Sequence, residues 1–242
     1  MGVEGQLTKE MMGSNLPVDM PATNLDAGFF KEVRMLRFDY VTNPEIAARV
    51  IPSKFSLADD ALASFVILEY GFTFVGPYKE AILSVNVLYK DSPYAYPVQL
   101  MLNSALPTMG GREMGIPKKV GFVEITQHED TLAGYVDRPQ GERLATGILL
   151  IDQPIEPFPE EMPGPSLMLR PVVYPDKPVQ MDLIRVDSVW KPTRMHAATG
   201  SCSCTGLSVV DPWHTIPVKE MLGASYFEGE LCFTGGETLE TF

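Results

Sequence analysis

The sequence predicts a β-rich α+β fold: a single domain built on an antiparallel, closed and cone-like β-barrel with a few short helices. Apolar runs of strand length recur from residue 32 onward, and Pro and Gly separate them. Parallel β-α-β winding needs amphipathic helices of about 10 to 15 residues between such runs, and the sequence lacks them. The chain of 242 residues is long enough for one such domain.

The chain is expected to begin with an arm, followed by a strand and a short helix. Residues 1–28 are predicted to form the N-terminal arm, and residues 29–242 the barrel domain. The run 34–41 has apolar residues at every second position, which is typical of a half-buried strand. Asn43 and Pro44 then supply a helix cap and a first helical residue, so a short helix is predicted next.

The remaining elements are predicted to be strands, with one further helix. The strands are expected over 62–75, 80–90, 96–106, 120–129, 131–138, 143–152, 166–175, 181–190, 193–202 and 225–233. The proline-rich segment 153–165 is expected to be a surface excursion between strands. Pro217 and Gly223 are start and stop signals, so a helix is predicted over 216–224.

Composition excludes several classes of partner. The net charge of −12 disfavours nucleic acid and anionic membranes, because like charges repel. Three cysteines and three histidines, without metal-ligand spacing, indicate neither a disulfide framework nor a metal site. The first twenty residues lack the apolar core of a secretory signal, and no apolar run approaches the ~18 residues of a spanning helix. A cytoplasmic protein is therefore expected.

A lysine pair, Lys118 and Lys119, lies in the otherwise apolar segment 111–122. Burial penalises the charged form of a lysine, and a like charge nearby penalises it further. An uncharged lysine amine can attack a ketone and form an iminium, which is an electron sink for breaking an adjacent C–C bond. Most lysine pairs are solvated, so the pair taken alone also fits an ordinary surface.

The segment 111–121, GREMGIPKKVG, resembles the active-site segment of the acetoacetate decarboxylase family. It is one residue shorter than the usual pattern and has Ile116 where the family often has an aromatic residue. The segments 40–52, 130–150 and 216–224 resemble further parts of the same family. The resemblance implies the family's barrel, a homo-oligomer and chemistry that needs no cofactor.

The resemblance also implies catalytic roles. Lys118 matches the Schiff-base lysine and Lys119 its cationic neighbour; acetoacetate decarboxylase is itself a standard example of a lysine activated by apolar surroundings or a nearby cation. Adjacent residues of an extended chain face opposite sides, so Lys119 can also point elsewhere. Glu80 matches the family's active-site glutamate, because it precedes Gly111 by 31 residues as in the family. Without the resemblance, Glu80 would be read as an exposed acid at a strand start.

Other site residues are less directly implied. Arg34 is the nearest match to the family's arginine that holds the substrate carboxylate, and Arg37 is its rival. Only one of the two can share a face with the core residues. Arg112 and Glu113 are expected to form an ion pair that supports the lysine loop. A second acid of some family pockets aligns by strand length with Val66, while Glu69 lies nearby, and this departure leaves the substrate open.

The predicted function is that of a Schiff-base-forming carbon–carbon lyase (a carboxy-lyase). It would decarboxylate a β-keto acid, acetoacetate or a larger analogue, through a lysine iminium and an enamine. Two alternatives stay open. The same iminium would serve an aldolase, dehydratase or cyclase acting on a larger keto substrate. A barrel that only binds a small apolar ligand would need neither Lys118 nor Glu80.

Overall fold

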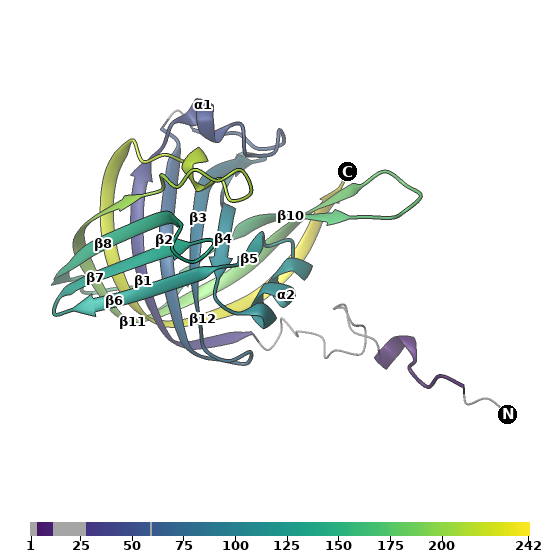
Figure 1. Ribbon diagram of the computed structural model, residues 1–242, viewed down its shortest axis with the longest axis horizontal. Helices are drawn as coiled ribbons and strands as arrows, with labels where there is room; N and C mark the ends of the chain where they lie inside the picture. The colour runs from purple at the N-terminus through teal and green to yellow at the C-terminus, as the bar shows by residue number, and fades with distance from the viewer. Residues whose placement is uncertain (1–3, 12–27, 59) are drawn as a thin grey trace.

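The computed structural model describes residues 4–11, 28–58 and 60–242, and β-strands dominate them (Figure 1). The predicted arm lies largely outside the described residues, and its described part contains a short 3-10 helix, η1, at Lys9–Met11. Two α-helices, α1 (Pro44–Ala47) and α2 (Ala105–Glu113), and a second 3-10 helix, η3 (Trp213–Thr215), complete the described helices.

The strands form one sheet of 12 members. They are β1 Phe29–Val41, β2 Leu62–Thr73, β3 Tyr78–Tyr89, β4 Ser92–Leu102, β5 Lys118–Val120, β6 Phe122–His128, β7 Thr131–Asp137, β8 Arg143–Pro154, β9 Met162–Pro163, β10 Ser166–Val172, β11 Gln180–Ser203 and β12 Glu220–Thr241. Their order is β10-β4-β3-β2-β1-β12-β11-β8-β7-β6, with β5 beside β4 and β9 beside β11.

Most strand pairs are antiparallel, and the β-rich antiparallel fold is thereby confirmed; β4 pairs in parallel with β5 and β10. β10 also pairs with β11, so the two ends of the path β10-β4-β3-β2-β1-β12-β11 meet. The contact between β10 and β4 is a single residue pair, Ser166 with Ala95. Closure into a true barrel therefore stays a prediction.

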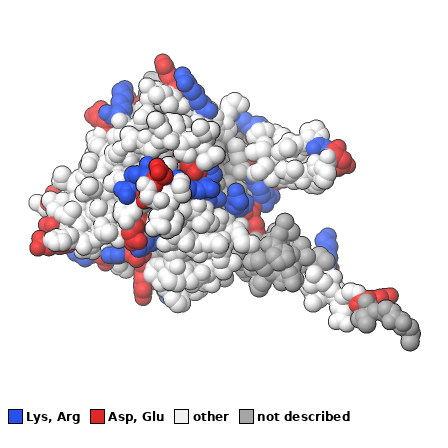
Figure 2. Space-filling view, viewed as in Figure 1, with Lys and Arg blue, Asp and Glu red and all other residues white. Residues whose placement is uncertain are grey.

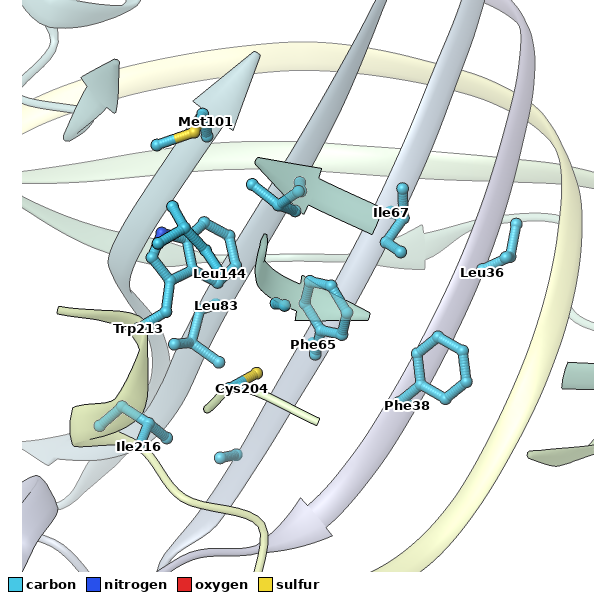
Figure 3. Close-up of a cluster of buried hydrophobic side chains, with 14 of the residues drawn as sticks. Leu36, Phe38, Phe65, Ile67, Leu83, Met101, Leu144, Cys204, Trp213 and Ile216 are labelled. Atoms are coloured by element: carbon cyan, nitrogen blue, oxygen red, sulfur yellow. The ribbon is translucent and has the colours of Figure 1, made fainter. Parts of the chain in front are cut away.

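The sheet has apolar side chains on both faces. What we call the first core contains Leu36 and Phe38 of β1 and Phe65 and Ile67 of β2, packed against residues of β6, β7, β8 and η3 (Figure 3). The second core lies on the opposite face. It contains Val33, Met35, Val66, Leu68, Tyr70, Tyr78, Leu100, Leu102, Met114, Ile116 and Phe227 among others. This split matters because alternate residues of each strand belong to different cores.

The predicted cap of α1 is confirmed: the side chain of Asn43 accepts a hydrogen bond from the backbone N–H of Ile46. The helix α2 was not predicted, since the sequence indicated a strand reaching residue 106. Pro107 and the adjacent glycines of α2 have low helix propensity in a helix interior, so the local pattern conceals this helix.

The helix predicted over 216–224 is wrong. Residues from Glu220 onward belong to β12, where Met221 pairs with Tyr40 of β1 and Gly223 pairs with Asp39. Pairing with β1 supplies every second residue of this segment with backbone partners, and that overrides the local helix signals. The two strands predicted over 181–190 and 193–202 are one continuous strand, β11.

The charged surface is mixed. Figure 2 shows acidic and basic side chains interspersed on one face of the molecule, with broad uncharged areas between them. This face therefore lacks the single-sign basic surface that binding to phosphate backbones requires. Among the described residues, no helix has both the length and the apolar character needed to span a bilayer.

Candidate active site

Lys118 reaches the second core through the pairing of β5 with β4. In this parallel pair Lys118 lies beside Leu100, a second-core residue, and Lys119 lies beside Met101, a first-core residue. Alternation along β5 thus sends the two lysine side chains to opposite faces. The side chain of Lys118 is only 8% exposed.

Two glycines let the chain before β5 approach closely. A Cβ atom on Gly111, in the last turn of α2, would lie 2.5 Å from both Cδ and Cε of Lys118. Gly115 has a φ of +79°, and a Cβ there would lie 2.8 Å from the backbone of Leu169. The glycines of the GREMG segment therefore allow α2 to press against the lysine side chain.

Glu80 is the acidic partner of Lys118. Lys118 Nζ lies 3.0 Å from Glu80 Oε2, and the Glu80 side chain is only 5% exposed. The hydroxyl of Tyr70 donates a hydrogen bond to Glu80 Oε1 at 3.4 Å. Burial and the nearby carboxylate raise the pKa of Tyr70 well above its usual value, so this phenol keeps its proton. The structure thus brings together the two residues that the sequence analysis placed at the centre of the site.

A small apolar pocket lies at the lysine. Its volume is about 40 Å³, which exceeds the space a single water needs. It is lined by Gly28, Phe30, Phe74, Val75, Tyr78, Pro107, Gly110, Gly111, Met114, Lys118 and Phe233. Among the described residues of that lining, Lys118 is the one charged side chain, and its Nζ lies 5.8 Å from the centre of the Tyr78 ring.

Lys119 is not part of this pocket. Its Nζ donates to Asp211 Oδ1 at 2.9 Å and also to the carbonyl oxygen of Val210. Arg138 donates to the same Asp211 oxygen at 3.0 Å, and the Asp211 side chain is 1% exposed. Lys119 therefore helps to neutralise a buried carboxylate on the other face, and the structure does not bring it to Lys118.

The two candidate arginines lie on different faces. Arg34 is on the first-core face, where its guanidinium contacts Glu69 and, at 3.3 Å, the side-chain oxygen of Gln127. The geometry thus does not support the preference for Arg34 as a substrate-binding residue. Arg37, two positions from Met35, lies on the second-core face and pairs with Asp39 at 2.8 Å. The rival is therefore the arginine that shares a face with Lys118.

Arg112 and Glu113 do not form the predicted ion pair with each other in the described part of the chain. They are consecutive residues of α2, and consecutive helical side chains point in different directions. Arg112 is exposed. The backbone carbonyl of Glu113 accepts a hydrogen bond from Arg170 at 2.9 Å, which ties the end of α2 to β10.

Sequence reasoning missed Tyr70 and Tyr78. Both lie on the same face of the sheet as Glu80. Tyr78 precedes Glu80 by two residues on β3, and Tyr70 of β2 is paired with Tyr78. The alternation of β3 was a usable signal for Tyr78, because residues two apart share a face. The contact of Tyr70 depends on strand register, which the sequence alone does not reveal.

The fold and site define a class of protein: a β-rich domain with a buried lysine–glutamate pair at an apolar pocket. The chain belongs to the acetoacetate decarboxylase (ADC) family, whose sequence profile matches residues 15–241. It is accordingly an enzyme of the acetoacetate decarboxylase-like, carboxy-lyase type.

Individual relatives agree with this assignment. The chain is 26% identical to Decarboxylase DEC1 of Cochliobolus heterostrophus, over 95% of each chain, and 28% identical to an acetoacetate decarboxylase of Acidiphilium cryptum, over 84% of each chain. Among solved structures, one acetoacetate decarboxylase has a TM-score of 0.85 at 19% identity, covering 97% of this chain and 99% of that one. The acetoacetate decarboxylase of Legionella pneumophila has a TM-score of 0.79 at 19% identity, covering 92% and 93%.

A further structural relative is an enzyme with a bound ligand. The enduracididine biosynthesis enzyme MppR, complexed with the condensation product of pyruvate and imidazole 4-carboxaldehyde, has a TM-score of 0.74 at 16% identity, covering 94% of this chain and 96% of that one. At this identity the likeness concerns the fold.

Proposed function

We propose that the protein decarboxylates a β-keto acid through an iminium formed on Lys118. One observation carries the proposal: a buried lysine nitrogen lies 3.0 Å from a buried carboxylate oxygen, beside a pocket whose other described lining residues are uncharged. An ammonium is not a nucleophile, so the amine needs a nearby group to accept its proton, and Glu80 is within reach.

The first half of the reaction builds the iminium. A proton passes from Lys118 to Glu80, and the free amine adds to the ketone carbon of the substrate. The hydroxyl of the resulting carbinolamine takes a proton from Glu80 and leaves as water, so a C=N bond forms. The hydrogen bond from Tyr70 keeps one oxygen of Glu80 oriented while the other exchanges the proton.

The second half releases carbon dioxide. The C–C bond to the carboxylate breaks, its electron pair moves into the iminium, and neutral CO₂ and a neutral enamine result. An apolar pocket favours this step, because it destabilises the ionic starting state more than the neutral products. The enamine carbon then takes a proton, water hydrolyses the new iminium, and the ketone product leaves with the lysine restored.

The test is covalent trapping. The protein is incubated with acetoacetate and sodium borohydride, and the modified residue is mapped by mass spectrometry. We expect a reduced adduct on Lys118 that Lys118→Arg abolishes. Lys119→Arg is the matched control, since its side chain occupies the other face, and it should retain the adduct. An adduct on another residue, or full turnover by Lys118→Arg, would refute the assigned role.

A second candidate reaction keeps the iminium but uses it for aldol condensation or dehydration. The observation that favours it is a cavity of about 460 Å³ on the same face of the sheet, with room for a second carbonyl compound. A panel of keto acids separates the two candidates. Release of CO₂ from an acid that forms the adduct supports decarboxylation, whereas adduct formation without release of CO₂ supports the second candidate. Absence of any adduct across a panel of keto acids would favour a barrel that only binds a ligand.

A further inference from the structure

A second cavity, which we call the distal cavity, opens on the face of the sheet that carries Lys118 and Glu80. Its volume of about 460 Å³ lies within the range of small-molecule sites. Strands β1, β2, β3 and β12 supply most of its wall, and β4, β9, β11 and Gly164 supply the rest. Acetoacetate, with its short chain, would leave most of this space unfilled.

The reacting pair lies between the distal cavity and the small apolar pocket. Along β3, Tyr78 lines the small pocket, Glu80 pairs with Lys118, and Ile82 lines the distal cavity. These three residues are two apart and therefore share one face. Leu68, which is directly opposite Glu80 on β2, also lines the distal cavity. The distal cavity thus adjoins Glu80 on this face of the sheet.

The wall of the distal cavity becomes more polar with distance from Glu80. The next row of paired residues contains Arg37, Val66 and Ile82, and the row after it contains Asp39, Ser64 and Ser84. Two such rows correspond to roughly 13 Å along a strand. A ligand that reaches the polar row from Lys118 therefore has to pass Val66 and Ile82, with Arg37 beside them, first.

Two serines at the polar end line the distal cavity. Ser64 is 8% exposed and Ser84 6% exposed, and they face each other across β2 and β3. Within the described ranges, neither hydroxyl has a hydrogen bond to another residue, and neither oxygen is fully buried, so a molecule in the cavity can reach both. Each hydroxyl can donate one hydrogen bond and accept others, so the pair can bind an oxygen function of a ligand.

The charge at this end is balanced. Arg37 holds Asp39 through contacts of 2.8 to 3.0 Å, so the cation and the anion neutralise each other. An ionic ligand group would have to break this pair, whereas a hydroxyl or a carbonyl oxygen would not. The polar end thus suits an uncharged oxygen function.

We infer that the distal cavity holds the chain of the substrate, and that the substrate is an extended keto acid rather than acetoacetate. Its chain would continue beyond the ketone, pass Val66 and Ile82, and end in a hydroxyl or carbonyl group that forms hydrogen bonds with Ser64 and Ser84. The carboxylate would then occupy the small apolar pocket on the other side of Lys118. This inference rests on the proposed function for the reacting end of the substrate.

The kinetic test compares three acids: acetoacetate, 3-oxodecanoate and ω-hydroxy-3-oxodecanoate. For each, kcat/KM of CO₂ release is measured in the wild type and in the double variant Ser64→Ala/Ser84→Ala. We expect the hydroxy acid to be the best substrate, at least ten-fold better than acetoacetate. The double variant should reduce the preference for the hydroxy acid over 3-oxodecanoate by roughly ten-fold. Ser201→Ala, an exposed serine of β11, is the control that should leave this preference unchanged.

A binding test avoids the chemistry. Trp190 lines the distal cavity, whereas the other of the 2 tryptophans, Trp213, is buried in the first core, so a change in fluorescence on titration is assigned to Trp190. Titration with 1,8-octanediol, which has no ketone, should change this fluorescence in the wild type, and the double serine variant should need about ten-fold more of the diol.

The outcomes separate the two claims. Turnover of acetoacetate with rejection of both long acids, or a hydroxyl preference that survives the double variant, overturns the inference and leaves the proposed function intact. Failure of every acid to give CO₂ or an adduct on Lys118 overturns the proposed function; a serine-dependent diol signal would then still support a ligand cavity. Absence of any diol signal counts against the inference.

Discussion

Gly111→Ala is a sharp test of the site because it adds one carbon atom at a known position. The new Cβ would lie 2.5 Å from Cδ and Cε of Lys118, whereas ordinary contacts begin at 3.4 Å. The lysine side chain must therefore retreat by roughly 0.9 Å, the difference between these values. Its methylene groups are flexible and give way more easily than the backbone, so the amine moves relative to Glu80 while the fold persists.

The expected loss is large for activity and small for stability. A displacement of about 1 Å at a reacting group can cost about 100-fold in rate. Alanine is better than glycine in a helix by about 0.8–1 kcal/mol, which offsets part of the strain in α2. We therefore expect Gly111→Ala to lower kcat by about 100-fold and to unfold in urea at a concentration close to that of the wild type.

The assay combines initial rates of CO₂ release, borohydride trapping and urea unfolding followed by circular dichroism. Gly235→Ala is the matched control, because a Cβ there would meet nothing within 4 Å. Wild-type turnover in Gly111→Ala would refute the argument that the position of the Lys118 amine is set by α2. A collapse of stability in parallel with activity would instead show that the backbone, and not the lysine, absorbs the clash.

Four further predictions concern other parts of the molecule. Glu80→Gln should lower kcat by about 100- to 10,000-fold, because it removes the proton acceptor of the amine. Adduct formation followed by stopped flow checks this, and a wild-type rate of formation in the variant would contradict it. Lys119→Met should keep its turnover but lose about 1–2 kcal/mol of unfolding free energy, since the buried Asp211 loses one of its two cations; a large fall in kcat would contradict the placement of Lys119. Burial and the Glu80 carboxylate raise the pKa of Tyr70, so the folded state holds a proton that the unfolded chain releases above about pH 10; the contribution of Tyr70 to the unfolding free energy should fall there by up to ~1.4 kcal/mol per pH unit, and Tyr70→Phe should show a slope shallower than that of the wild type. The molar mass by light scattering should be a multiple of 26.7 kDa, and a monomer at micromolar concentration would refute the expected homo-oligomer.

Local pattern was sufficient for most strands. The alternation in β1 and the Asn43 cap of α1 depend on neighbouring residues only, and both are as the sequence predicts. The helix predicted over 216–224 failed because the partner that makes this segment a strand is β1, about 180 residues earlier in the chain. For α2 the reverse held: Pro107 and its two glycines are typical of a loop, and packing against β5 stabilises the helix.

The sequence by itself determined that a lysine pair follows a glycine-containing segment, that Glu80 is a candidate partner, and that the strands alternate. Only the tertiary structure decided that Lys118 meets Glu80 while Lys119 turns to Asp211, and that Arg37 rather than Arg34 shares their face. The physical reason is that the residues of a strand alternate between its two sides, which the sequence shows directly. Strand register and contacts between residues distant in the chain determine which partner each side meets.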